Sequence, residues 1–211
     1  MSFRPPRPEP LRIDGPAGPI EALLEDPQAQ PGTGFGVVCH PHPLYGGTMT
    51  NKVVHTVARS LQEQGMPTVR FNYRGVGQSA GQYDGGTGET ADALAVVAWG
   101  RERWPGVPLT LAGFSFGSMV ALLATPAAQP AELITVAPAV SNAQFSSVQP
   151  PPCPWLIIQG TADEVVDYTQ VQAFAARFAP PPVLRLLPGV DHFFNGRLPE
   201  LREAVLQRQV A

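Results

Sequence analysis

The chain has 211 residues, a formal net charge of −3, 44% hydrophobic residues and 15% charged residues. This length suits one domain with a sizeable core, and the composition excludes a long disordered or coiled-coil protein. No apolar run reaches the roughly 18 residues of a membrane-spanning helix, and the opening ten residues lack the apolar core of a secretory signal. We therefore expect a cytoplasmic protein with no membrane partner.

Short apolar runs alternate with helical patterns along the chain. The Pro-rich residues 1–18 are expected to form a loosely packed N-terminal arm, and residues 19–211 a single domain. Strands are predicted at residues 20–24, 35–39, 67–72, 109–113, 133–136, 155–159 and 183–187. Apolar residues at helical spacing predict helices over residues 53–61 and 91–99, from the 113–117 segment to 124, and over 171–178 and 201–210.

This alternation of strands and helices predicts the α/β class, with a mostly parallel central sheet flanked by helices on both faces. The apolar run at residues 35–39 (FGVVC) is typical of a strand that is buried on both faces. The Pro clusters at residues 149–154 and 179–182 are interpreted as connections within the domain, because strands continue on either side of them. No sizeable lid domain is expected.

Charge and cysteine content argue against several kinds of partner. The basic residues are scattered, and Lys52 is the only lysine, so nucleic acid is not an expected partner. The two cysteines, Cys39 and Cys153, provide neither metal-ligand spacing nor a disulfide framework, and both are expected to be small buried apolar side chains. Oligomeric state is not indicated by the sequence.

The most informative motif is the segment at residues 113–117 (GFSFG). It follows a predicted buried strand and opens an apolar helix, which is the setting of a nucleophile elbow. A sharp turn there exposes the hydroxyl of Ser115, and the helix N-terminus supplies N–H groups where an oxyanion forms. The alternative is a Gly-rich turn with a helix-capping serine, but the strand before and the helix after favour the elbow.

A nucleophilic serine needs a base and an acid that orients the base. In this architecture both follow the nucleophile in the chain, acid first. The only histidine after Ser115 is His192, so it is the predicted base. The candidate acids are Asp163, Glu164, Asp167 and Asp191. Asp163 is favoured because it follows a strand and so lies at the edge of the sheet where the carboxyl ends of the strands meet.

The other acidic residues fit less well. Asp167 is predicted to help begin the next helix, because carboxylates favour helix N-termini. Asp191 adjoins His192 in the sequence, and side chains of neighbouring residues in an extended loop point apart.

The oxyanion hole is expected to take one N–H group from Phe116 and one from the loop at residues 40–47 (HPHPLYGG). Pro41 and Pro43 have no N–H group, so His42 is the preferred donor and Leu44 the alternative. A rival interpretation makes His40 and His42 metal ligands, with His55 as the nearest third histidine. His55 lies on a predicted helix among core positions, so no site is completed and no metal is expected.

A second rival interpretation is a dinucleotide site at residues 75–80 (GVGQSA), which resemble a phosphate-binding fingerprint. No helix begins at the second glycine, and no acidic residue ends a strand about 20 residues later. We therefore predict a long loop here and no nucleotide or other cofactor.

These segments together resemble the α/β-hydrolase superfamily, over nearly the whole chain from about Ile20. The closest likeness is to small, lidless serine hydrolases related to dienelactone-hydrolase-like proteins. It rests on residues 39–47 (CHPHPLYGG), 70–79 (RFNYRGVGQS), 113–117 (GFSFG), 160–163 (GTAD) and 191–194 (DHFF). The resemblance implies a triad of Ser115, Asp163 and His192. Dienelactone hydrolases proper use a cysteine nucleophile where this chain has Ser115, so their particular reaction is not implied.

The expected activity is hydrolysis of small esters through an acyl-enzyme, with a small-molecule ester as the partner. The walls of the substrate site are predicted to include apolar side chains near the motifs: Leu44, Tyr45, Phe114, Phe193 and Phe194. A thioesterase or a small peptidase on the same triad is an open alternative, as is a non-catalytic interaction protein on a hydrolase scaffold.

Overall fold

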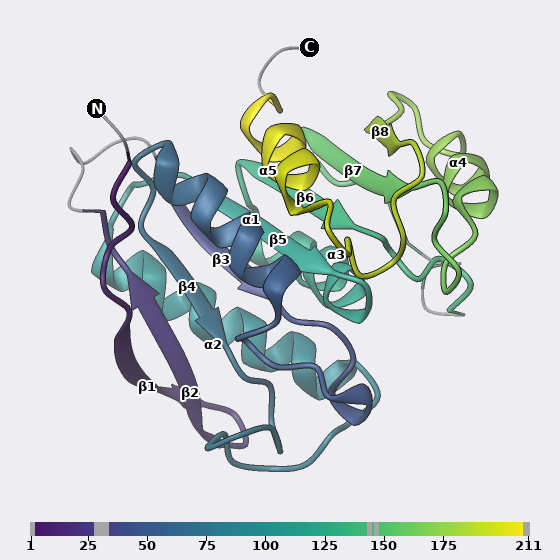
Figure 1. The fold of residues 1–211 in the computed structure, drawn as a ribbon. Helices are drawn as coiled ribbons and strands as arrows, with labels where there is room; N and C mark the ends of the chain where they lie inside the picture. Colours follow the sequence, from purple (N-terminus) through teal and green to yellow (C-terminus); the bar gives the residue numbers. More distant parts are fainter. Residues whose placement is uncertain (1–2, 28–33, 143–144, 146–147, 209–211) are drawn as a thin grey trace.

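The computed structural model describes residues 3–27, 34–142, 145 and 148–208. Among these residues, eight strands and five α-helices alternate along most of the chain (Figure 1). The strands are β1 (Glu9–Gly15), β2 (Gly18–Glu25), β3 (Phe35–Cys39), β4 (Thr68–Phe71), β5 (Leu109–Phe114), β6 (Glu132–Val136), β7 (Trp155–Gly160) and β8 (Val183–Leu187). The helices are α1 (Lys52–Glu63), α2 (Thr87–Arg103), α3 (Phe116–Ala128), α4 (Tyr168–Ala175) and α5 (Leu198–Leu206), with a 3₁₀ turn η1 (Pro43–Tyr45).

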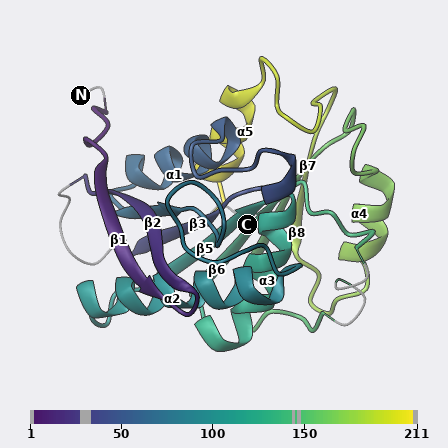
Figure 2. The ribbon, with the colours of Figure 1, turned by 90° about the horizontal axis from the view of Figure 1, so that it is seen from below.

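All eight strands form one sheet in the order β1-β2-β4-β3-β5-β6-β7-β8. The strands β4, β3, β5, β6, β7 and β8 run parallel to one another, whereas β2 is antiparallel to both of its neighbours, β1 and β4. Helices α1 and α5 cover one face of the sheet, and α2 and α3 cover the other (Figures 1 and 2). The chain therefore has the α/β-hydrolase fold that the sequence predicts.

Helices cover both faces of the central sheet, so strand residues that point to opposite sides are buried alike. In β5, Leu111 belongs to the core under α2 and α3, whereas its neighbour Ala112 belongs to the core under α1 and α5. In β7, Ile157 and Ile158 divide in the same way. This double burial explains why the central strands appear in the sequence as continuous apolar runs.

The prediction of a loosely packed N-terminal arm is wrong for residues 9–15. They form β1, which pairs with β2 along its whole length from Glu9 to Gly15, and Ile13 is buried in the core under α2. Pro10 is tolerated because β1 lies at the edge of the sheet, where a missing N–H group breaks no necessary bond.

The remaining differences concern where elements end. Helix α3 continues to Ala128, beyond the predicted end at Ala124. Helix α4 ends at Ala175, so Phe178 packs in the core from outside the helix. Helix α5 begins at Leu198 and ends at Leu206, and Val210, at the end of the predicted helix, lies outside the described residues.

Candidate active site

Ser115 lies in a strained turn between β5 and α3. Its backbone has φ +54° and ψ −116°, a conformation that costs on the order of 1–3 kcal/mol for a residue with a side chain. Neighbouring bonds hold the turn in place, because Ser115 N donates to Val136 O at 2.8 Å and Ser118 Oγ lies 2.9 Å from Gly113 O.

The two glycines of this segment are required by close packing. A Cβ at Gly113 would lie 2.0 Å from Gly117 O, and a Cβ at Gly117 would lie 2.4 Å from Cys39 O. No side chain fits at either position. The first turn of α3 therefore packs directly against the end of β3, which leads into the predicted oxyanion loop.

Three side chains form a hydrogen-bonded chain at the carboxyl ends of β5, β7 and β8. His192 Nε2 lies 3.2 Å from Ser115 Oγ, and His192 Nδ1 lies 2.8 Å from Asp163 Oδ2. The side chains of both His192 and Asp163 are buried. Since the carboxylate accepts the proton on Nδ1, Nε2 is left with the lone pair that faces the serine hydroxyl.

Asp163 is held by more than the histidine. Its Oδ1 accepts from Val165 N at 2.9 Å and from Val166 N at 2.7 Å, and Gln159 Nε2 donates to Oδ2 at 2.9 Å. Burial alone would raise the pKa of this carboxyl, but the hydrogen bonds from His192 and Val166 outweigh burial and lower the pKa. Asp163 therefore stays ionised beside the imidazole.

The other three candidate acids have different partners. Asp167 Oδ1 accepts from Thr169 N at 2.8 Å, so Asp167 caps α4 as predicted. Asp191 binds Asn195 through both carboxylate oxygens. Glu164 Oε2 lies 3.5 Å from His192 N, at the backbone rather than the imidazole ring.

The loop after β3 is held in one conformation by its two histidines. His40 is fully buried, its Nε2 accepts from Tyr73 N at 3.1 Å, and its Nδ1 donates to Pro41 O at 2.7 Å. Burial lowers the pKa of His40 to about 4, so the ring is neutral. Both ring nitrogens are engaged within the protein, which contradicts the rival interpretation of His40 as a metal ligand.

The ring of His42 organises the turn that follows. Its Nδ1 accepts from Leu44 N at 3.3 Å and its Nε2 lies 3.2 Å from the hydroxyl of Tyr83. The ring also packs 4.8 Å from that of Phe116, measured between centroids. The N–H group of Leu44 is thus committed to the His42 side chain, which favours the backbone N–H of His42 as the second oxyanion donor.

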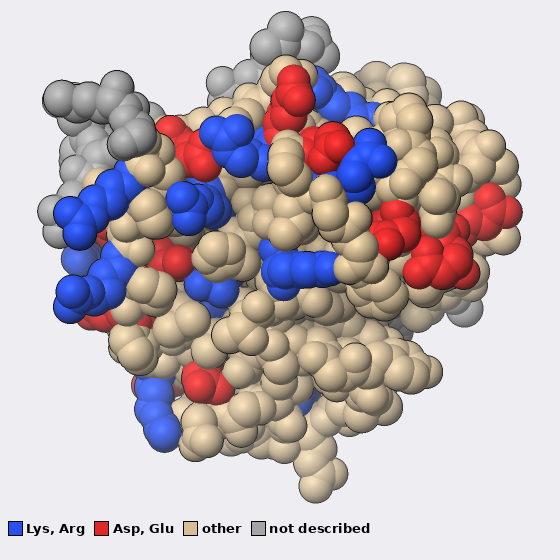
Figure 3. All heavy atoms as spheres, viewed as in Figure 1, with Lys and Arg blue, Asp and Glu red and all other residues tan. Residues whose placement is uncertain are grey.

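A cavity of about 340 Å³ opens over Ser115 and His192. Three of its lining side chains are apolar or aromatic and largely exposed: Tyr45 at 87%, Val165 at 59% and Phe193 at 46%. The rest of the lining consists of Pro41, His42, Gly46, Gly47 and Asn51. Around η1 the surface is largely uncharged, whereas acidic and basic side chains are interspersed over the upper part of the same face (Figure 3).

Of the five residues predicted as substrate walls, two line this cavity. Tyr45 and Phe193 line the cavity, whereas Leu44 is exposed on η1 and does not. Phe114 and Phe194 are 1% and 0% exposed and belong to the core under α1 and α5. They fail as substrate contacts because adjacent residues point in opposite directions, so Phe114 points into the core beneath Ser115.

The sequence reasoning did not identify Val165 or Asn51 as cavity residues. The position of Asn51 at the start of a helix could have been predicted, because an Asn directly before apolar residues at helical spacing is a typical helix N-cap. Its Oδ1 accepts from Val53 N at 2.9 Å and Val54 N at 3.4 Å. Val165 carries no such signal, because its place at the cavity follows from the turn that Asp163 makes.

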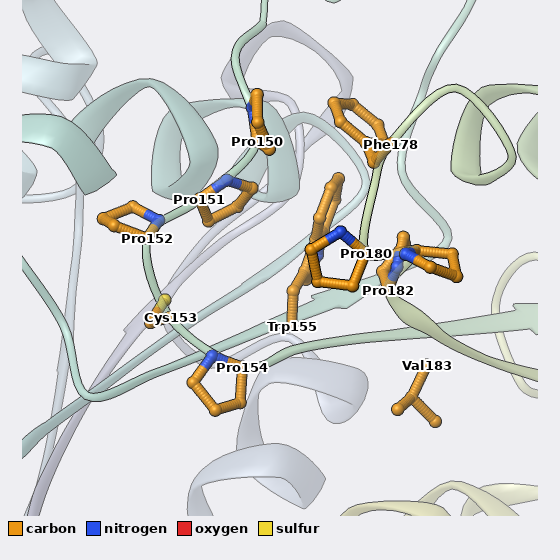
Figure 4. A pocket seen from close by; sticks show the side chains of 11 residues that line it. Pro150, Pro151, Pro152, Cys153, Pro154, Trp155, Phe178, Pro180, Pro182 and Val183 are labelled. Atoms are coloured by element: carbon orange, nitrogen blue, oxygen red, sulfur yellow. The ribbon is translucent and has the colours of Figure 1, made fainter.

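A larger apolar hollow of about 490 Å³ lies at the opposite ends of the strands. Figure 4 shows prolines of the segments before β7 and β8 around the ring of Trp155, with Phe178 beside them. The only thiol there is Cys153, which is half-buried, and burial raises the pKa of this thiol to about 11. Cys39 is buried as expected, and its pKa is raised to about 12 by burial.

The glycine-rich segment at residues 75–80 is a loop, as predicted, and the structure adds that this loop is bound to β2. Glu21 Oε2 accepts from Gln78 N at 2.8 Å and from Asn72 Nδ2 at 2.8 Å. A Cβ at Gly77 would lie 2.3 Å from the same oxygen. Glu21 therefore binds this loop, and no helix begins at its second glycine, since α2 begins only at Thr87.

No helix among the described residues is long and apolar enough to cross a membrane. The same part of the chain holds no group of three or more His, Cys, Asp or Glu side chains that could hold a metal ion.

Comparison with known proteins places this geometry in a family. Residues 37–153 match the family described as serine aminopeptidase, S33. The chain is 33% identical over 205 residues to an uncharacterized protein of Rickettsia prowazekii, covering 92% of this chain and 86% of that protein. The chain belongs to this family of α/β hydrolases.

Two solved structures with higher sequence identity to this chain give the same result. An α/β serine hydrolase homologue from Coxiella burnetii is 44% identical, with a TM-score of 0.93 over 99% of this chain and 100% of that one. A Xanthomonas campestris protein described as an α/β serine hydrolase without lid is 42% identical, with a TM-score of 0.90 over 99% of this chain and 96% of that one. The protein is an α/β serine hydrolase. The narrower likeness to dienelactone-hydrolase-like proteins stays a prediction.

Proposed function

We propose that the protein is a carboxylesterase that cleaves small, uncharged esters through an acyl-enzyme on Ser115. The observation that carries this proposal is the hydrogen-bonded chain from Asp163 through His192 to Ser115, with the serine in a strained turn above the sheet. Among the described residues that line the cavity over it there is no Asp, Glu, Lys or Arg, which suits a neutral ester.

In the first half of the reaction, His192 Nε2 takes the proton from Ser115 as Oγ bonds to the carbonyl carbon. The carbonyl oxygen becomes an oxyanion that accepts hydrogen bonds from the backbone N–H groups of Phe116 and His42. The tetrahedral intermediate then breaks its bond to the alcohol oxygen, which takes the proton from His192 and leaves. Asp163 stabilises the transient imidazolium and holds its tautomer.

In the second half, water attacks the acyl-enzyme with His192 again as base, releasing the acid and restoring Ser115. The N–H of Phe116 is available for the oxyanion because it lies in the first turn of α3, where N–H groups have no acceptor within the helix. These steps need only groups that the chain supplies at this site.

The proposal is tested by covalent labelling. A fluorophosphonate should label the wild-type protein on Ser115, located by peptide mass spectrometry, and Ser115→Ala should lose the label. The same variant should lose ester turnover by on the order of a thousandfold or more. Far-ultraviolet circular dichroism checks that the variant is folded. A folded Ser115→Ala protein that still labels and turns over like wild type would overturn the proposal.

The family description raises a second candidate, an aminopeptidase. An aminopeptidase must bind the ammonium group of its substrate, which calls for a carboxylate facing the cavity. Among the described residues that line this cavity there is none, and Asp163 is committed to His192 and to the amides of Val165 and Val166. A panel with one acyl group presented as ester, thioester and amide decides the matter: we expect the ester to be cleaved fastest.

A further inference from the structure

Asn51 lies where the oxyanion loop meets α1, and most of its polar atoms are already engaged. Its backbone N donates to Thr48 O at 3.1 Å, and its backbone O accepts from His55 N at 2.9 Å. Its side-chain Oδ1 caps α1 by accepting from Val53 N and Val54 N. These two donors also settle the orientation of the amide, because only the oxygen can accept them.

The amide nitrogen Nδ2 is the part of Asn51 left to meet a substrate. Asn51 lines the cavity over Ser115, together with Tyr45 and Phe193. The other donors of the lining are engaged: Gly46 N and Gly47 N bind within the turn, and Val165 N binds Asp163. Among the described lining residues, Nδ2 of Asn51 is therefore the donor that remains for a substrate. The exposed hydroxyl of Tyr45 and the groups of the proposed reaction are the exceptions.

The segment that carries Asn51 is rigid, so the donor is preorganised. Met49 N donates to Asn72 Oδ1 at 2.9 Å, and Arg70 Nη1 donates to Met49 O at 2.7 Å. Arg70 in turn pairs with Glu25 at 2.8 Å, with both side chains buried. A donor held this firmly loses little entropy when it binds a substrate atom, which is the condition for specificity.

We propose that Asn51 Nδ2 is a specificity-determining donor that selects esters carrying a second, neutral oxygen acceptor near the scissile bond. Such an acceptor is an ether, ketone or second ester oxygen on the acyl or the alcohol part. A carboxylate acceptor is disfavoured because Asp163 lies in the same site, and the chain's single lysine, Lys52, is bonded to Asn195. This inference rests on the proposed esterase function and deepens it.

The test compares pairs of substrates that differ by one oxygen in place of a methylene. On the acyl side the pair is p-nitrophenyl methoxyacetate and p-nitrophenyl butyrate. On the alcohol side it is 2-methoxyethyl butyrate and butyl butyrate, followed by titration of released acid. For each pair, the kcat/KM of the oxygen-containing ester is divided by that of its methylene counterpart. This ratio in a variant is then divided by the same ratio in wild type, which cancels the intrinsic reactivity of the substrates.

Two variants remove the donor and keep the helix cap. Asn51→Asp keeps the capping oxygen and replaces Nδ2 with a second oxygen, and Asn51→Ser keeps a capping oxygen without adding charge. We expect both variants to lower the ratio for at least one pair by roughly three- to tenfold, the value of one neutral hydrogen bond. Thermal unfolding midpoints close to wild type show that the cap is preserved.

The controls separate this inference from the proposed function. Asp167→Ser alters a matching cap, that of α4, outside the cavity lining, and should leave activity and ratio unchanged. If neither Asn51 variant changes either ratio, or if only Tyr45→Phe does, the inference is wrong while the esterase stands. If wild type cleaves none of the four esters, the proposed function itself fails.

Discussion

Ser115 has a backbone conformation that the protein maintains at a cost in free energy, and the hydrogen bonds around it show how. The N–H of Ser115 is bonded to Val136 O, so the turn between β5 and α3 is tied to the neighbouring strand β6. The serine side chain is thereby aimed at His192 before any substrate binds. Such preorganisation lowers the reorganisation that the reaction requires.

Among single residues, the orienting acid Asp163 gives the sharpest prediction. Asp163→Asn should lower kcat by on the order of a thousandfold or more, because an amide at this position no longer holds the imidazole in the tautomer that leaves Nε2 free to accept. Asp167→Asn and Asp191→Asn are matched controls from the same edge of the sheet and should retain most activity. Steady-state kinetics on all three variants would show a misassigned acid if the main loss fell on Asp191→Asn.

His40 should make stability depend on pH. Its pKa is lowered from 6.5 to about 4 in the folded state, mainly by burial, so between these values the unfolded chain binds a proton that the folded chain does not. The contribution of neutral His40 is fully present above pH 6.5 and is lost as the pH falls towards 4. The loss amounts to about 3 kcal/mol in the free energy of unfolding.

Denaturant unfolding at a series of pH values measures this effect. His40→Gln keeps a donor and an acceptor but does not titrate, so its stability should fall less than that of wild type between pH 6.5 and 4. His55→Gln, on the exposed side of α1, should keep most of the wild-type dependence. Parallel curves for wild type and His40→Gln would contradict the role assigned to His40.

Which site residues could be predicted from the sequence depended on whether their position follows from local chain geometry. The hydrogen-bonded arrangement of Ser115, Asp163 and His192 could be predicted, because each of them follows a strand and parallel strands end at one edge of the sheet. The substrate walls could not, because proximity along the chain does not say which way a side chain points. Phe114 and Phe194 neighbour active-site segments and yet face the core.

Among the elements, β1 shows where sequence reasoning was misled by composition. The prolines before and within it suggested an arm, although Leu11 and Ile13 alternate with Arg12 and Asp14 as in a half-buried strand. Residues 15–18 (GPAG) then form a tight hairpin turn, with Gly15 opposite Gly18. The hairpin signal was present, and the edge position explains why Pro10 does not prevent a strand.

Deletion of residues 1–15 should therefore destabilise the protein. It removes buried Ile13, worth about 2 kcal/mol of apolar burial, and leaves β2 as an unpaired edge that invites aggregation. Deletion of residues 1–7, which stops short of β1, is the matched control and should unfold like the full chain. Thermal unfolding with light scattering follows both effects. Equal midpoints for the two deletions would mean that β1 contributes nothing to the fold.

At the scale of the whole molecule, the alternation of strands and helices sets both the fold and the position of the site. Because β3, β5, β7 and β8 are parallel, the loops at their carboxyl ends meet on one side of the sheet. The opposite ends carry the proline-lined hollow, well separated from Ser115. What covers the site depends on the lengths of the loops at the carboxyl ends of these strands.

We expect the loop between β6 and β7 to bear on substrate size, since many larger hydrolases insert a lid there. None of the five helices that the structure describes comes from residues 137–154. Among the described residues that line the cavity, the exposed apolar and aromatic side chains are those of Tyr45, Val165 and Phe193. Beyond it, each further methylene of an acyl chain stays in water and gains none of the roughly 0.8 kcal/mol of burial.

We therefore expect a preference for acyl chains of roughly two to six carbons, because longer chains extend past the cavity without further burial. Without a lid to move, the rate should also not jump when the substrate forms droplets. Kinetics on p-nitrophenyl esters from acetate to palmitate, below and above their solubility limits, measure both properties. Tyr45→Ala and Phe193→Ala, which shorten the cavity walls, should lower kcat/KM for butyrate several-fold with little effect on acetate. An optimum at ten carbons or more would mean that the exposed apolar side chains around Ser115 extend the acyl site along the surface.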